Sequence, residues 1–89
     1  MNIEIEKQEE GRFIVTVSEG QSKSSHLVTV KADYYQTLTG GKATEEELVR
    51  KSFEFLLERE PKEAILGQFE IELIARYFPE YEGEIKKRL

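Results

Sequence analysis

The chain has 89 residues, no cysteine, and a formal net charge of −5 with its single histidine neutral. A chain of this length forms one domain, residues 1–89, with a small core. Without cysteine it can build neither a disulfide nor a thiolate metal site. The negative charge argues against nonspecific nucleic-acid binding, because that binding needs a basic face.

The distribution of apolar residues bears on localisation. No apolar run approaches the roughly 20 residues that span a bilayer. The N-terminal stretch MNIEIEKQEE is acidic and alternating, unlike a secretory signal peptide. We therefore expect a soluble cytoplasmic protein that does not bind membranes.

Three segments near the N-terminus alternate between apolar and polar residues, which is the pattern of half-buried strands. They cover residues 2–7, 12–18 and 25–31. A glycine stands in each turn between them and can adopt the positive φ that tight turns need. We therefore expect a three-stranded antiparallel meander. Its second face carries Ile14 and Leu27, two candidates for contact with a partner.

The stretch from Thr44 to Pro61 predicts the central helix. Thr44 and Glu47 form a capping box, and Pro61 disfavours helical geometry at Glu60. About half of the helix circumference is apolar: Leu48, Val49, Phe53, Phe55, Leu56 and Leu57. A surface helix needs a narrower apolar stripe. This helix is therefore expected to pack on two sides, against the sheet and against another helix or a partner chain.

Shorter helical segments are expected around the central helix, at residues 34–38 with Asp33 as the cap, 62–66, 69–78 and 80–89. The predicted fold is α+β, a three-stranded antiparallel β-meander followed by three to four helices packed on one face. The expected core consists of Ile3, Ile5, Phe13, Val15, Val17, Val28, Val30, Leu38, Leu48, Val49, Phe53, Leu56, Leu57, Ile65, Leu66, Phe69, Ile71, Ile74 and Phe78.

His26 is the only histidine and lies on the apolar face of its strand, with Val28 and Val30. It could act as a general base or metal ligand, but one histidine without cysteine cannot build the usual zinc set. A histidine packed within the sheet is the favoured interpretation. Ser24 shares this face but lies about 7 Å along the strand, so a turn role is favoured over a nucleophile.

The glutamates are spread around the polar side of the central helix, and no calcium-binding loop pattern is present. We therefore predict no catalytic, cofactor-binding or metal-ligating residue, and no cofactor. Three tyrosines near turns, Tyr34, Tyr35 and Tyr81, are candidates for partner contact, because tyrosine combines a large contact area with a polar tip.

The most distinctive stretches are SFEFLLEREP at Ser52–Pro61 and RYFPEYE at Arg76–Glu82. With them, the run from His26 to Ile85 resembles a group of small bacterial proteins of unknown function. This resemblance implies no activity and no site residues. Three strands followed by Thr-Glu-Glu-Glu-Leu also resemble the layout of HicB-type antitoxins. The Pro-Gly turn that follows the strands in that family is missing, so toxin binding is not carried over.

Three functions remain as hypotheses. The first is a cytosolic protein-interaction or regulatory module without catalytic activity, binding a protein partner or forming a homodimer. The second is an antitoxin-like regulator that sequesters a small basic toxin through charge complementarity. The third is a small enzyme that uses His26 and nearby carboxylates.

Overall fold

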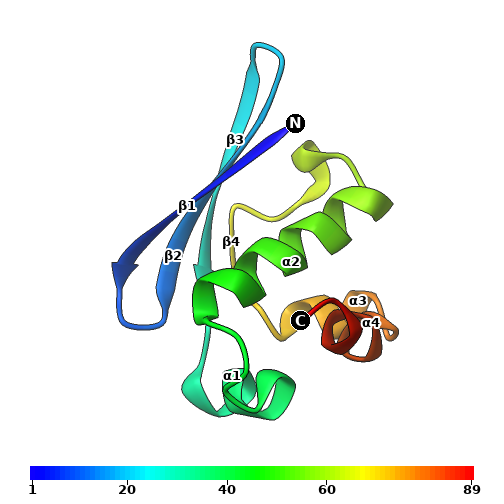
Figure 1. The fold of residues 1–89 in the computed structure, drawn as a ribbon. Helices are drawn as coiled ribbons and strands as arrows, with labels where there is room; N and C mark the ends of the chain where they lie inside the picture. The colour runs from blue at the N-terminus through cyan, green and yellow to red at the C-terminus, as the bar shows by residue number, and fades with distance from the viewer.

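The computed structural model describes all residues from Met1 to Leu89. Its elements occur in the order β1 (Asn2–Glu9), β2 (Arg12–Glu19), β3 (Ser22–Thr29), α1 (Ala32–Thr39), α2 (Glu45–Arg59), a 3-10 turn η1 (Lys62–Ala64), β4 (Gln68–Glu70), α3 (Leu73–Tyr77) and α4 (Tyr81–Arg88). The predicted α+β class is confirmed. The helices lie on one side of the sheet, and the tip of the β2–β3 hairpin projects beyond them (Figure 1).

Strands β1, β2 and β3 form the predicted antiparallel meander, with Ile5 opposite Val15 and Val15 opposite His26. The β1–β2 turn depends on Gly11, whose φ is +73° and where a Cβ atom would come within 2.8 Å of the Val30 carbonyl oxygen. Alternation along β2 separates the two faces, since Val15 and its neighbours on that face are buried while Ile14 is half-buried. The helical layer thus covers one face of the sheet.

The sheet has four strands, so the prediction of three was incomplete. The short strand β4 pairs in parallel with β3, placing Phe69 beside Val28. Phe69 points into the core, whereas Gln68 and Glu70 are exposed. Three residues are too few for strand alternation to be distinguished from helical spacing, because both patterns contain isolated apolar positions. The helix expected from residue 69 therefore begins only at Leu73.

The termini of α2 follow the sequence signals closely. The Thr44 hydroxyl oxygen accepts a hydrogen bond from the Glu47 amide at 3.0 Å, and the Glu47 carboxylate accepts from the Thr44 amide at 3.2 Å. Glu60 is extended before Pro61, which ends the helix there. The predicted cap of α1 was wrong, because Lys31 occupies the N-cap position and Asp33 lies inside the first turn.

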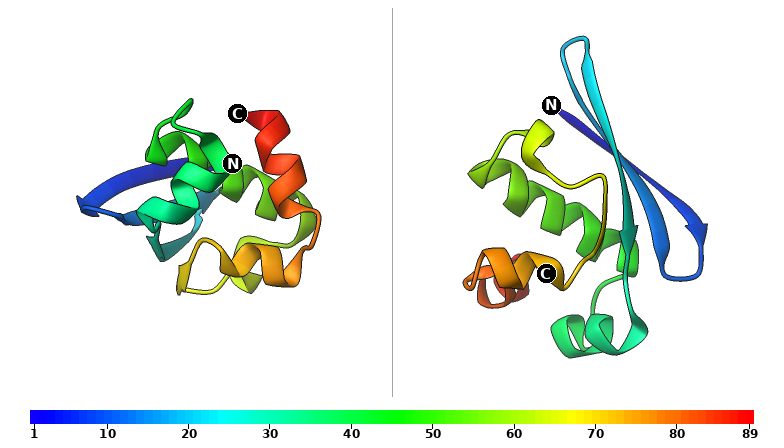
Figure 2. Two further views of the ribbon diagram at one scale, coloured as in Figure 1. Left: turned by 90° about the horizontal axis from the view of Figure 1, so that it is seen from below. Right: turned by 180° about the vertical axis from the view of Figure 1, so that it is seen from behind.

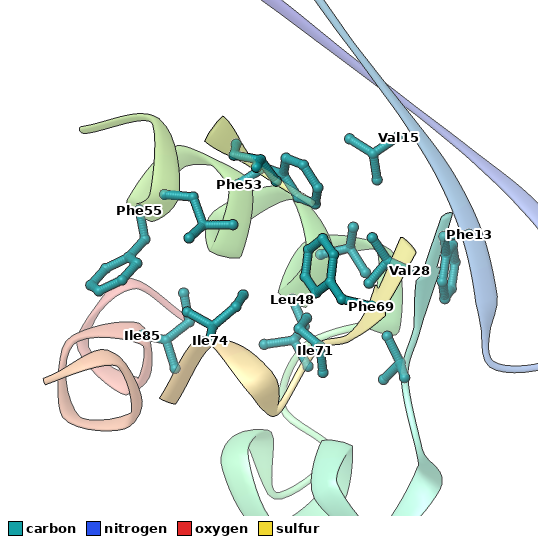
Figure 3. Packing of buried hydrophobic residues seen from close by; sticks show 14 of the residues in the cluster. Phe13, Val15, Val28, Leu48, Phe53, Phe55, Phe69, Ile71, Ile74 and Ile85 are labelled. Atoms are coloured by element: carbon teal, nitrogen blue, oxygen red, sulfur yellow. The ribbon is translucent and has the colours of Figure 1, made fainter. Parts of the chain in front are cut away.

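Helix α2 is covered on two sides, as its wide apolar circumference predicted. Phe53 faces the sheet. The centroid of its ring lies 5.4 Å from the centroid of the His26 ring and 6.1 Å from that of the Phe69 ring. Phe55 faces the opposite way and packs edge-on against Tyr81, at a centroid distance of 5.3 Å. Figure 3 shows Phe53 on the side of Val15 and Phe55 on the side of α4. The second cover is therefore supplied by the same chain.

Two views in Figure 2 show α3 and α4 beside α2 on the side away from the strands. The predicted core is largely confirmed, with one clear exception, since Leu66 is 48% exposed. Three fully buried residues extend it, Phe55, Tyr81 and Ile85. None of the helices combines the length and apolar character that crossing a membrane would require.

Replacing Phe55 with alanine is expected to lower the free energy of unfolding by about 3–5 kcal/mol, because it empties a fully buried aromatic site. Urea denaturation followed by circular dichroism measures the change. Leu57→Ala on the same helix is the control, since Leu57 is only partly buried. If both variants lose the same free energy of unfolding, Phe55 is not part of a packed core between α2 and α4.

Arg88 on α4 donates two hydrogen bonds to Glu58 on α2, at 2.6 and 2.9 Å. These bonds hold the pKa of Glu58 below its ordinary value of 4.5. The folded-state pKa lies below the unfolded one, so this contact stabilises the fold above pH 4.5 and loses its effect as the pH falls through the folded-state pKa.

Arg88→Gln is expected to raise the pKa of Glu58 toward its ordinary value, measured by NMR titration of the side-chain carboxyl carbon. Lys87→Gln makes the same charge change in the same turn of α4 but removes neither hydrogen bond. An equal shift in both variants would show that overall charge, not the bonded pair, sets this pKa.

Candidate functional site

A groove with a volume of about 390 Å³ opens beside the C-terminal half of α2. Its walls come from α2, from the connection that contains η1 and β4, and from α3. Nine of its ten lining residues are apolar: Leu56, Ala64, Ile65, Leu66, Phe69, Leu73, Ile74, Tyr77 and Phe78, with Glu60 as the tenth. We call this feature the apolar groove.

The rim of the apolar groove exposes large apolar side chains. Tyr77 is 66% exposed and Leu66 48% exposed, whereas Leu56 and Ile74 on the floor are buried. Isolated exposed apolar residues are ordinary, but here two of them line one hollow whose other lining is also mainly apolar. Mainly apolar hollows are where binding sites are sought first, so the apolar groove is the candidate site.

Glu60 is the only charged residue that lines the apolar groove. It follows the last residue of α2, where the helix dipole places negative partial charge. The end of the groove beside the C-terminus of α2 is therefore electronegative. The chemistry that matches this surface is an apolar group with a positive charge beside it.

His26 is buried, with 2% of its surface exposed, and both ring nitrogens are hydrogen-bonded. Its Nδ1 lies 2.8 Å from the Leu66 carbonyl oxygen, and its Nε2 lies 2.8 Å from the Ser24 hydroxyl. A carbonyl can only accept, so Nδ1 carries a proton, and in the tautomer with its single proton there Nε2 accepts from Ser24. The ring thus joins β3 to the connection before β4.

Ser24 is closer to His26 than the strand spacing suggested. The two residues are two positions apart on β3 and lie on the same face. Their side chains approach each other, so that the Ser24 hydroxyl oxygen and His26 Nε2 are within hydrogen-bond distance. No carboxylate hydrogen-bonds to the ring, because its two partners are Ser24 and Leu66. The pairing expected of a histidine–carboxylate enzyme is thus replaced by a histidine–serine pair.

Lys62 anchors the other end of the same connection. Its side chain is almost completely buried, and the ammonium group donates to the Ser22 hydroxyl at 2.5 Å and to Glu63. The bond to Lys62 holds the pKa of Glu63 below its ordinary range. The Leu27 amide also donates to the Gly67 carbonyl. Residues 61–67, which we call the 61–67 segment, are thus held along β3.

The predicted partner-contact residues occupy different environments. Ile14 and Leu27 are cross-strand neighbours and half-buried on the face of the sheet away from the helices. Tyr34 is partly buried and donates to Glu82 at 2.8 Å. Tyr35 is partly buried and donates to the Ala43 carbonyl. The structure therefore groups Ile14 with Leu27 on the sheet and places both tyrosines on α1, outside the strands.

Tyr81 is a core residue, completely buried between α2 and α4. Its hydroxyl lies 2.6 Å from that of Ser52. Burial raises the pKa of Tyr81 above its ordinary value, and burial does the same for Tyr34. Tyr81 presents no surface to a partner. Its near-turn position suggested exposure, but its spacing with Ile85 at i,i+4 was the signal for the core.

Neither Leu66 nor Tyr77 was predicted as a site residue. The apolar helical pattern predicts Leu66 as a core residue, but 48% of its surface is exposed. The break at Gly67 was the available signal, since it ends the turn and leaves Leu66 in an extended connection. Tyr77 is the last residue of the five-residue helix α3 and is exposed, although the helical spacing placed it among apolar residues.

Comparisons with known protein families, with curated proteins and with solved structures found no match. The resemblance to small bacterial proteins and to antitoxins therefore stays a prediction. The structure contains no group of three or more histidine, cysteine, aspartate or glutamate side chains placed to hold a metal ion.

His26→Phe is expected to lower the free energy of unfolding by about 1–3 kcal/mol, because an aromatic ring is kept while the part-buried Leu66 carbonyl loses its donor. Ser24→Ala is the control, since it leaves that donor in place and should cost about 1 kcal/mol or less. Urea denaturation gives both values. Amide hydrogen exchange at Leu27 should accelerate only in His26→Phe, and acceleration in both variants would contradict a specific anchor.

Proposed function

We propose that the protein is an interaction module that binds an apolar segment of a partner protein in the apolar groove. The observation that carries this proposal is a hollow of about 390 Å³ with nine apolar lining residues and a rim at which Leu66 and Tyr77 stand exposed. The volume lies at the lower end of the range for ligand pockets. It is suited to a few large side chains.

The energetics favour an apolar occupant. Complete burial of a leucine-sized side chain contributes about 1.5–3 kcal/mol. Leu66 and Tyr77 each have roughly half or more of their surface still to bury. Tyrosine is also enriched where proteins meet. A partner segment that covers both rim residues and fills the groove makes the central apolar contact on which a small interface depends.

The charge pattern favours a basic partner. Glu60 places a carboxylate at the end of the groove, and the whole chain carries −5. A second copy of the chain would bring the same negative charge, whereas a basic segment is attracted during encounter. We therefore propose an amphipathic helix with a row of apolar anchors and lysine or arginine on its polar side. An antitoxin-like regulator that binds a small basic toxin is one form of this function.

A synthetic amphipathic helix, with leucines at i, i+3, i+4 and i+7 and lysines elsewhere, is the probe. NMR chemical shifts of the labelled protein should change mainly at residues 64–66 and 73–78. The paired substitution Leu66→Ser with Tyr77→Ser should weaken binding at least about tenfold, or about 1.4 kcal/mol. Both side chains are substantially exposed, so these variants should retain the fold.

Ile14→Ser with Leu27→Ser is the matched control on the other predicted contact surface, and it should leave binding unchanged. Glu60→Lys should shift the preference from the lysine peptide toward a glutamate version of it. Shift changes centred on Ile14 and Leu27, or no saturable binding, would overturn the proposal.

A further inference from the structure

We propose that Ser24 is an activated serine nucleophile with His26 as its general base. This site is separate from the apolar groove and does not depend on the function proposed for it. It rests on three observations: the hydrogen bond between Ser24 and His26, the fixed tautomer of His26, and the difference in exposure between the two side chains.

The hydrogen bonds give His26 the orientation that a base requires. Because Leu66 offers a carbonyl oxygen 2.8 Å from Nδ1, the ring proton resides on Nδ1. The free lone pair is then on Nε2, which lies 2.8 Å from the Ser24 oxygen. A serine hydroxyl, a histidine base and a third group that orients the base are the parts of a nucleophilic site.

The two side chains differ in exposure, because His26 is buried and Ser24 is partly exposed. His26 is 2% exposed and lies against the Phe53 ring, so it is held in one position. Ser24 is partly exposed. On the same strand face, Ser22 receives a hydrogen bond from the Lys62 ammonium. Ser24 thus lies between the two anchors of the 61–67 segment, with a positive charge near one end.

The chemistry is acyl transfer from an activated ester. The Ser24 oxygen attacks the carbonyl carbon as its proton passes to Nε2 of His26, giving a tetrahedral oxyanion. The oxyanion collapses, the bond to the leaving oxygen breaks, and His26 returns the proton to that oxygen as the alcohol departs. Water then attacks the acyl-serine, giving up a proton to His26. The proton returns to Ser24 as the carboxylic acid leaves.

The orientation of His26 defines the class of substrate. The 61–67 segment is hydrogen-bonded to β3 at Ser22, at His26 and at Leu27, which are positions on both sides of Ser24. An ester with a good leaving group is the expected substrate class, because only a backbone carbonyl orients the base. A carbonyl rather than a carboxylate orients His26, so the rate gain should fall below the 10²–10⁴-fold that a positioned base can contribute.

Diisopropyl fluorophosphate tests the site on the intact protein. It forms a stable adduct with an activated serine, and peptide mass spectrometry gives the labelling rate at each residue. Ser25 is the internal reference, because it is more exposed but lies on the opposite strand face, away from His26. We expect Ser24 to react at least about tenfold faster than Ser25, a difference that disappears in urea.

His26→Gln should reduce the Ser24 rate to that of Ser25, since the amide can still donate to Leu66 but cannot accept a proton. Ser25→Ala should leave the Ser24 rate unchanged. If Ser24 reacts no faster than Ser25 in the folded protein, or if His26→Gln folds and labels at the original rate, the proposal is overturned. The comparison within the original chain decides the question even where a variant fails to fold.

Discussion

The structure depends on one constraint, the need to cover α2 on two opposite sides. Phe53 and Phe55 are two residues apart, which corresponds to about 200° around a helix. Both are completely buried. A single sheet can cover only one of them, so the chain must place a second layer against the other. That requirement explains why the C-terminal residues fold back as α3 and α4, with Tyr81 and Ile85 filling the space beside Phe55.

The path of the chain between these two layers creates the candidate sites. After α2 the backbone returns to the sheet, runs along β3 as the 61–67 segment and β4, and then leaves again for α3. The hydrogen bonds of Lys62 with Ser22 and of His26 with Leu66 hold the 61–67 segment against β3. A connection and a five-residue helix cover the end of α2 less completely than a long helix would. The apolar groove is the space that remains.

Local sequence signals predicted much of this fold because the main elements repeat their pattern often enough. Fifteen residues of α2 display its period and both its termini, and the first three strands each alternate over several residues. The three-residue strand β4 offered no such repetition. The pairing of Ser52 with Tyr81 joins residues 29 positions apart, and that of His26 with Leu66 joins residues 40 apart. Such contacts follow from the packing of whole elements. The spacing of Tyr81 with Ile85 and the break at Gly67 were signals of burial and exposure, but the partners of Tyr81 and Leu66 could not be predicted from spacing.

Leu66 connects the two candidate sites within one residue. Its carbonyl oxygen accepts from His26 and fixes the tautomer that faces Ser24. Its side chain forms part of the rim of the apolar groove. Backbone and side chain of one residue move together, so an occupant that holds the Leu66 side chain also restrains the carbonyl that orients His26. The proposed groove and the proposed serine site therefore share Leu66, and any coupling of binding between them would be reciprocal.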